Sequence, residues 1–362
     1  MVTPSRLVLA RKRRRMTLAA LSTASGISVR SLTAYENGHK APAADTSYAL
    51  ASALQVPLSF LQGSTLEEIP IDAVSFRALS KMTALDRGAA LSAGRIAMLI
   101  NDWIEKRFRL PEANLPTFPH LGPEEAAERV RAFWGLGESP IPNMVHLLEA
   151  NGVRVFSLAH DCQDVDAFSF KHKGRPFVFL NTSKSGERGR FDAAHELGHL
   201  VMHSEHRVPN GMQAEEEAQA FASALLMPRA DLLAHSVYDM TPNQILVAKR
   251  RWKVAALALT YRLHEIGMLS DWKYRTAAKR LSQLGYRRSE PGGIARESSQ
   301  VLTKVFRLMV RDVGGWRPLL DELQLTREEL NRHVFGLVPV AVEGGGQRSF
   351  DRPTLQLVRG TK

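Results

Sequence analysis

The sequence predicts a mainly α-helical protein with one small β-sheet, an α+β fold built from several units. Most of the chain has the apolar spacing of helices, and strand-like runs occur at 153–158, 167–171 and 176–180. Its 362 residues exceed one average domain. With 44% hydrophobic and 23% charged residues, the composition is typical of globular domains with sizeable cores.

The elements follow in a clear order along the chain. Residues 1–62 are helical, with turns at Gly26 and Gly38, and a helix within 79–108 ends in a proline-rich stretch. A helix at 123–135 with an acidic first turn precedes the three strands, and Gly174 predicts a hairpin between the last two. Helices at about 188–203 and 213–226 follow, then a helical pair at 241–269 and a basic helical tail, loose near Gly344.

We therefore expect four units. These are an N-terminal helical domain at 1–63, a helical connector at 64–122, a central α+β domain at 123–270, and a helical basic extension at 271–362.

The charge of the chain points to an anionic partner. The formal net charge is +11, and residues 1–62 hold eight Lys or Arg against two Asp or Glu, a net +6. We interpret the basic run 11–15 as a DNA contact. The single cysteine, Cys162, forms no intramolecular disulfide and receives no role. Without a signal-peptide pattern or an 18-residue apolar run, we expect a cytoplasmic, nucleoid-associated protein.

Residues 16–38 have the spacing of a helix-turn-helix. Thr17 and Ser28 can each cap a helix start with a side-chain oxygen, and Gly26 supplies the turn between the helices. The predicted small core consists of Ala20, Leu21, Ile27, Leu32 and Tyr35.

This segment resembles the lambdoid-repressor (XRE) helix-turn-helix family over residues 5–62. The sequence Glu36-Asn37-Gly38, the later 50–57 and Phe60-Leu61 carry the resemblance, which implies a five-helix lambda-repressor-like domain. It also implies an internal ion pair between Arg11 and Glu36. One departure is Leu18, where the family often has a glutamine that reaches a phosphate.

By that resemblance, the helix 28–37 lies in the major groove of double-stranded DNA. Val29, Arg30 and Ala34 face base edges, and Arg30 is the best specifier because guanidinium can bind guanine O6 and N7 together. The other predicted contacts, mainly to phosphates, come from the two helix starts and the end of the reading helix: Thr17, Ser28, Ser31, Thr33, Asn37 and Lys40.

The strongest chemical signal is His195-Glu196-Leu197-Gly198-His199. Histidines four residues apart on one helix present both imidazoles on one face, which suits two neutral nitrogen ligands of Zn²⁺. Glu196 can accept a proton from the attacking water, whose pKa a metal ion lowers to roughly 7. The other faces of this helix are apolar, so we expect the helix to be buried. Buried polar groups without partners are costly, and a bound metal ion would give these histidines a partner.

The helix at 213–226 can supply a third ligand. Glu215 and Glu217 are the candidates, whereas Glu216 points elsewhere; alternatively, all three glutamates only stabilise the helix start. His203 shares the face of His195 and His199. We interpret it as a structural histidine, with a supporting or substrate-contacting role as the alternative.

Residues 191–203, the glutamate-rich turn and the segment 221–228 resemble the ImmA/IrrE family of metallopeptidases, with the match covering about 120–270. The resemblance implies a gluzincin-like domain, with Glu215 as third ligand and Glu217 in reserve. It implies that 176–180 is an edge strand for an extended peptide, and that 243–268 is a closing helical pair. Gln219 departs from the usual Asp or Asn.

We therefore expect a DNA-binding transcriptional regulator with a zinc endopeptidase domain, in which manganese is an alternative metal. The resemblance implies cleavage of a repressor-like partner protein in stress response or mobile-element control, and we expect a homodimer. One alternative is an antitoxin or repressor that binds DNA and a partner toxin and uses the peptidase fold as an interaction platform. Another is a housekeeping peptidase whose helix-turn-helix binds protein.

Overall fold

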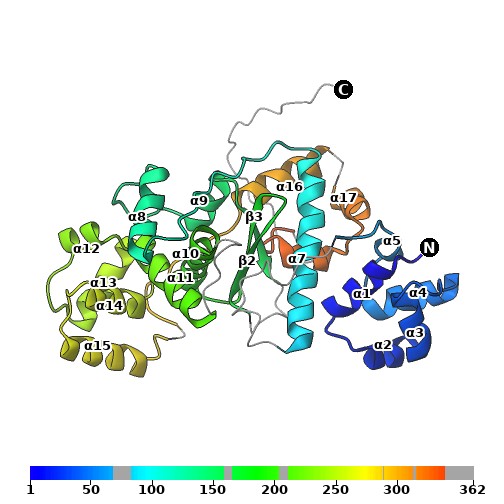
Figure 1. The fold of residues 1–362 in the computed structure, drawn as a ribbon, viewed down its shortest axis with the longest axis horizontal. Coiled ribbons are helices and arrows are strands. Elements are labelled where there is room, and N and C mark those ends of the chain that lie inside the picture. Colours follow the sequence, from blue (N-terminus) through cyan, green and yellow to red (C-terminus); the bar gives the residue numbers. More distant parts are fainter. Residues whose placement is uncertain (68–82, 159–164, 204–210, 288, 313–314, 339–362) are drawn as a thin grey trace, which may run out of the picture.

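The computed structural model describes the chain except for residues 68–82, 159–164, 204–210, 288, 313–314 and 339–362. Cys162, the start of the helix predicted from residue 79, and the loose segment near Gly344 lie outside the described residues. As predicted, the described part of the chain is mainly helical and contains one three-stranded sheet (Figure 1). Within the described residues, no helix has the length and apolar character needed to cross a membrane.

The N-terminal domain consists of five helices, as expected. They are α1 (Pro4–Arg13), α2 (Leu18–Ser25), α3 (Val29–Glu36), α4 (Ala44–Leu54) and α5 (Leu58–Leu61). The Thr17 hydroxyl oxygen accepts a hydrogen bond from the Ala20 N–H at 3.0 Å, and the Ser28 hydroxyl oxygen accepts one from the Ser31 N–H at 3.2 Å. Gly26 ends α2 with a φ of +72°, which a residue with a Cβ adopts at a cost.

The small core of this domain differs from the prediction at one position. Leu21, Leu32 and Tyr35 are buried and Ile27 packs partly buried against them, but Ala20 is exposed. Leu18 packs against the same core, so the residue that replaces the family's glutamine acts as a packing residue. The resemblance to the XRE family correctly predicted the ion pair between Arg11 and Glu36, which holds α1 to α3 at 2.6 and 2.7 Å.

The sheet contains β1 (Arg154–Leu158), β2 (Ala167–His172) and β3 (Arg175–Asn181) in the order β1-β3-β2. The predicted hairpin is confirmed, because β2 pairs antiparallel with β3 through the turn Lys173-Gly174, where both residues have positive φ. β1 pairs with β3 in parallel. The expectation that 176–180 is an edge strand is therefore wrong: β3 pairs on both sides, and β1 and β2 are the outer strands among the described residues.

One face of the sheet packs against helices of the central part of the chain. Val155, Val178 and Leu180 on this face belong to a core that includes Leu197 and Phe221. The helices that lie against this face are α9 (Met144–Ala150) and α10 (Gly186–Met202). The same core continues away from the sheet into α8 (Pro123–Phe133), α11 (Gly211–Leu226), α12 (Arg229–His235), α13 (Pro242–Trp252), α14 (Ala256–Glu265) and α15 (Asp271–Gln283).

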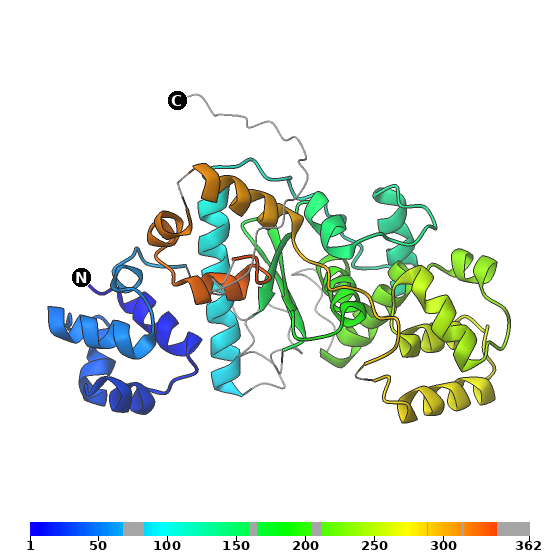
Figure 2. The same ribbon diagram turned by 180° about the vertical axis from the view of Figure 1, so that it is seen from behind.

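The other face of the sheet carries five stacked phenylalanines and packs against the predicted connector and tail. The helices here are α7 (Ala84–Glu105), α16 (Gln300–Asp312), α17 (Trp316–Leu323) and α18 (Arg327–His333). The phenylalanines are Phe156, Phe168, Phe170, Phe177 and Phe179. Seen from behind, α7 and the C-terminal helices cover this side of the sheet (Figure 2). The sheet is covered on both faces, so its strands are mostly apolar, with Ser157 and Ser169 among the buried polar exceptions.

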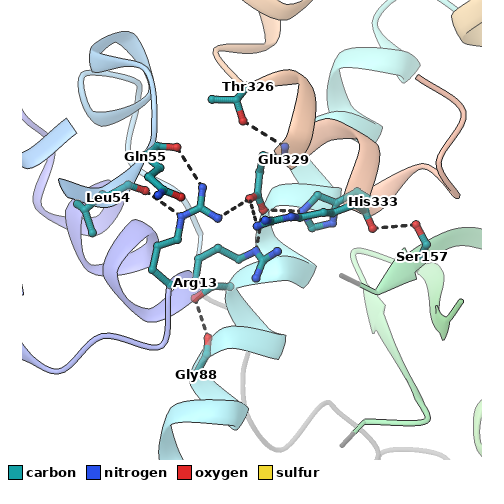
Figure 3. Close-up of polar contacts among 11 residues, drawn as sticks. Arg13, Leu54, Gln55, Gly88, Ser157, Thr326, Glu329 and His333 are labelled. Carbon is teal, nitrogen blue, oxygen red and sulfur yellow. Dashed lines mark hydrogen bonds and ion pairs between the residues drawn. The ribbon is translucent and has the colours of Figure 1, made fainter. Parts of the chain in front are cut away.

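A buried ion cluster joins the N-terminal domain to this second layer (Figure 3). The carboxylate of Glu329, on α18, accepts hydrogen bonds from Arg13 at 2.7 Å, Arg14 at 3.1 Å and His333 at 3.1 Å. From the same helix, the Arg332 backbone carbonyl accepts a hydrogen bond from the Ser157 hydroxyl of β1 at 2.9 Å. Through α18, helix α1 of the N-terminal domain is therefore connected to the sheet of the central domain.

This cluster changes the interpretation of the basic run 11–15. Arg13 is 2% exposed, so it cannot contact DNA in this structure. Arg14 pairs with the same glutamate, and Arg15 pairs with Asp86 of α7. The run serves largely to hold the domain together and to attach it to α7 and α18.

Candidate metal centre

Helix α10, which carries the histidine pair, is buried on most of its surface. Ser185 caps the start of the helix by accepting a hydrogen bond from the Arg188 N–H. Leu197, Leu200 and Val201 are buried in the core. The predicted apolar surroundings of the helix are therefore present, and the side chain of His195 keeps only 16% exposure.

Gly198 allows α11 to approach α10 closely at this point. A Cβ built on Gly198 would lie 3.0 Å from the Phe221 ring and 3.2 Å from the Ala218 Cα. These distances are shorter than ordinary van der Waals contact, so the absence of a side chain at Gly198 lets the two helices pack together. The close approach places the first turns of α11 opposite the histidines.

Three side chains converge across the two helices. The Nε2 atoms of His195 and His199 are 3.1 Å apart, and they lie 3.4 and 3.3 Å from the carboxylate oxygens of Glu215. Zinc bonds of about 2.0–2.1 Å place tetrahedral ligand atoms about 3.3 Å apart. The spacing of the three ligand atoms therefore fits one metal ion, and this is the grouping of potential metal ligands found in the described part of the chain.

The other glutamates of α11 lie elsewhere. Glu217 contacts His203, with 3.1 Å between the carboxylate and the Nε2 atom. Glu216 is exposed, as expected, and Gln219 is exposed too. Of the two glutamates considered as third ligand, the structure thus brings Glu215 to the histidine pair.

The electrostatics of the site favour a cation. Burial lowers the pKa of His195, but the hydrogen bond to Glu215 and the charge of Glu196 outweigh that effect, so the net shift is upward. Burial also raises the pKa of Glu215, and the hydrogen bonds from both histidines reverse this and hold it far below its usual value. Positive charge at the point of convergence is therefore stabilised.

Glu196 is held by a partner that the sequence analysis did not identify. Its side chain is buried, and the Ser169 hydroxyl donates a hydrogen bond of 2.6 Å to its Oε2 atom. Ser169 belongs to the outer strand β2, where it lies between Phe168 and Phe170. A serine between two phenylalanines was the available sequence signal, but only the packing of β2 against α10 identifies its partner.

His203 completes the polar residues around the site. Its Nδ1 atom lies 2.9 Å from the Nδ1 atom of His199, and its side chain is 7% exposed. Both ring nitrogens of His203 have partners, as expected of a structural histidine, and its contact with His199 also leaves the alternative of a supporting role open.

The residues predicted to contact DNA lie on the accessible side of the N-terminal domain. Val29, Arg30, Thr33, Asn37 and Lys40 are exposed, and Ser31 and Ala34 are partly so. Figure 1 shows α3 on the outer side of this domain, away from α7. Several hydroxyls already have backbone partners: Thr17 and Ser28 cap helices, and Thr33 donates to the Val29 carbonyl.

Comparisons with known protein families agree with both regions. Residues 7–61 match a helix-turn-helix family, and residues 148–264 match the family described as IrrE N-terminal-like domain, of peptidase type M78. A search among curated proteins gave no match. The predicted fusion is thus confirmed: the chain joins an XRE-type helix-turn-helix domain to an ImmA/IrrE-like, metallopeptidase-family domain.

Proposed function

We propose that this protein is a DNA-binding transcriptional regulator whose metallopeptidase domain cleaves a repressor-like partner protein, as part of a stress response or the control of a mobile element. The observation that carries the proposal is the convergence of His195, His199 and Glu215 beside the buried Glu196. A helix-turn-helix domain on the same chain favours a regulator that acts on few targets.

His195, His199 and Glu215 would hold the metal ion, which we take to be zinc, with manganese as the alternative. A bound ion would polarise the peptide carbonyl and acidify the attacking water. Glu196 acts as the base that accepts a proton from this water and passes it to the leaving amine. The hydrogen bond from Ser169 keeps one carboxylate oxygen occupied and holds the other in a fixed orientation.

The substrate would bind along the outer edge of β2. Among the described strands, β2 pairs only with β3, and an extended peptide can add to its free edge as a further strand. Ser169 lies on β2 and touches Glu196, so the same strand would position both the peptide and the catalytic carboxylate. This assignment replaces the strand 176–180 in the role suggested by the family resemblance.

The DNA contacts would come from α3 and the loop after it. Arg30 and Lys40 are exposed, and neither forms an ion pair within the described residues. Arg30 is proposed to read a base edge, and Lys40 a phosphate. We expect the regulator to bind its operator as a homodimer, as helix-turn-helix proteins with two half-sites do.

The first test is metal content. Wild-type protein and the His195→Ala, Glu215→Gln and Glu216→Gln variants are purified in parallel, and their zinc and manganese are measured. The first two substitutions should abolish stoichiometric metal, whereas the exposed Glu216 serves as a matched control and should leave it unchanged. Equal metal in all four proteins would contradict the proposed centre.

The second test is cleavage in cells. Newly formed protein N-termini are compared between cells that produce the wild type and cells that produce Glu196→Gln, under several stresses. A repressor-like protein cut only by the wild type supports the proposal. A partner that co-purifies uncut with both proteins would favour the interaction-platform function instead.

A further inference from the structure

We propose that His203 and Glu217 form a positioning relay for the metal ligand His199, an inference that rests on the proposed metal centre. The relay runs from Glu217 of α11 through His203, at the end of α10, to His199. It fixes which ring nitrogen of His199 carries a proton and which is available to the metal.

The distances define a continuous chain of contacts. The His199 and His203 Nδ1 atoms are 2.9 Å apart, and the His203 Nε2 atom lies 3.1 Å from a Glu217 oxygen. Gln213 donates a hydrogen bond of 2.8 Å to the other oxygen of Glu217. Both ring nitrogens of His203 are therefore engaged, and the terminal carboxylate is itself held in place.

The direction of each hydrogen bond follows from the metal-facing end. The Nε2 atom of His199 faces His195 and Glu215, so it must present its lone pair and Nδ1 must carry the proton. Nδ1–H then donates to the Nδ1 atom of His203. This leaves His203 protonated at Nε2, where it donates to Glu217. Only one hydrogen fits between two Nδ1 atoms 2.9 Å apart. The donors and acceptors of this hydrogen-bonded series therefore have a single arrangement once His199 presents Nε2 to the metal.

The consequence for His199 is a fixed ring orientation and a more basic Nε2 atom. Metal-ligating histidines commonly donate their second N–H to a carboxylate or carbonyl, which strengthens metal binding. Here a second histidine is placed between the ligand and the carboxylate. Gln219, which stands where the resembling family usually has Asp or Asn, is exposed and makes no such contact in the described structure.

The test uses a pair of isosteric substitutions in the full-length protein. Zinc dissociation constants are measured by competition with a chromophoric chelator for wild type, His203→Leu and His203→Asn. Leucine removes the acceptor for His199, and zinc affinity should fall about 10- to 100-fold. Asparagine has the same shape as leucine, but its Oδ1 atom can replace Nδ1 as acceptor, so most of the affinity should return. Visible spectra of the cobalt-loaded proteins should change for leucine and recover for asparagine.

His333 provides a control, because it too is a buried histidine that lies 3.1 Å from a glutamate carboxylate, but it belongs to α18 and the ion cluster of Glu329 rather than to the convergence of metal ligands. His333→Leu should lower the unfolding temperature of the metal-free protein and leave zinc affinity unchanged. A His203→Leu variant that binds zinc within twofold of wild type would overturn the relay alone. Absence of zinc binding in the wild type would overturn the metal centre, and the relay with it.

Discussion

Replacing Glu329 by glutamine should loosen the attachment of the N-terminal domain far more than the loss of a surface ion pair would. The carboxylate of Glu329 accepts hydrogen bonds from Arg13, Arg14, Arg332 and His333. The side chains of Arg13 and Glu329 are only 2% and 4% exposed. Glutamine keeps the shape and one acceptor oxygen, but it removes the charge and turns an N–H₂ group toward arginine donors.

The magnitude follows from burial. An exposed ion pair contributes at most about 1 kcal/mol, whereas removing one partner of a buried pair costs about 3–5 kcal/mol, because the remaining charge stays desolvated. Since Arg13 cannot reach solvent without moving α1 away from α18, the larger value applies. The free energy of opening at this contact should therefore fall by about 3–5 kcal/mol.

Native-state hydrogen exchange of α1 and α18 measures this opening directly, which matters because a multidomain chain need not unfold in one step. Amides of both helices should exchange at least about 100-fold faster in Glu329→Gln than in wild type. Glu328→Gln is the matched control, since Glu328 is the exposed neighbour on the same helix turn and loses only a helix-dipole contribution of less than about 1 kcal/mol. Equal exchange in the two variants would refute the reasoning.

Three further predictions follow from the same structure. Burial raises the pKa of Glu329, but His333 and the nearby arginines lower it far more. Because the pKa in the folded state lies below that in the unfolded state, the stabilisation from this carboxylate is complete above about pH 4.5 and is lost as the pH falls. The difference in urea stability between wild type and Glu329→Gln should therefore shrink from about pH 6 to about pH 3, and a constant difference would argue against it. Gly189→Ala should stabilise α10 by about 0.5–1 kcal/mol, because the added Cβ meets open space. Gly198→Ala should destabilise the protein by about 1–3 kcal/mol, because its Cβ would press on Phe221. Both free energies are measured by urea unfolding, and equal gains in stability would contradict the close packing of α10 and α11. Arg30→Ala should cost about 1–3 kcal/mol of operator binding and relax the preference at one base pair, measured by fluorescence anisotropy on an operator found by in vitro selection, and unchanged specificity would exclude Arg30 as a reader.

The features that sequence reasoning predicted well are those with local causes. The helix-turn-helix caps at Thr17 and Ser28 depend on residues three positions away, and the hairpin depends on the turn at Gly174. The spacing of His195 and His199 places both on one helix face whatever surrounds the helix. Such patterns therefore predicted the elements, the fold class and the two-histidine core of the site.

The order of the strands could not be predicted in the same way. All three strands are apolar because both faces of the sheet are buried, so nothing in their composition distinguishes the central strand from the outer one. Pro176 even favours an edge strand, because proline cannot donate a ladder hydrogen bond. It lies at the hairpin end of β3, opposite Lys171, where the central strand tolerates it. The partner of Ser169 depends on this order and was missed for the same reason.

By itself, the sequence determined the two functional modules of this protein, because helix capping, turn geometry and the spacing of metal-binding histidines act over a few residues. Tertiary structure alone decided which groups meet across the fold. Glu215 rather than Glu217 reaches the histidines because α11 packs on α10 through Gly198. Arg13 belongs to the interior because it meets Glu329, 316 residues away along the chain. A basic run looks the same in sequence whether its charges face DNA or a buried carboxylate, and only packing separates the two.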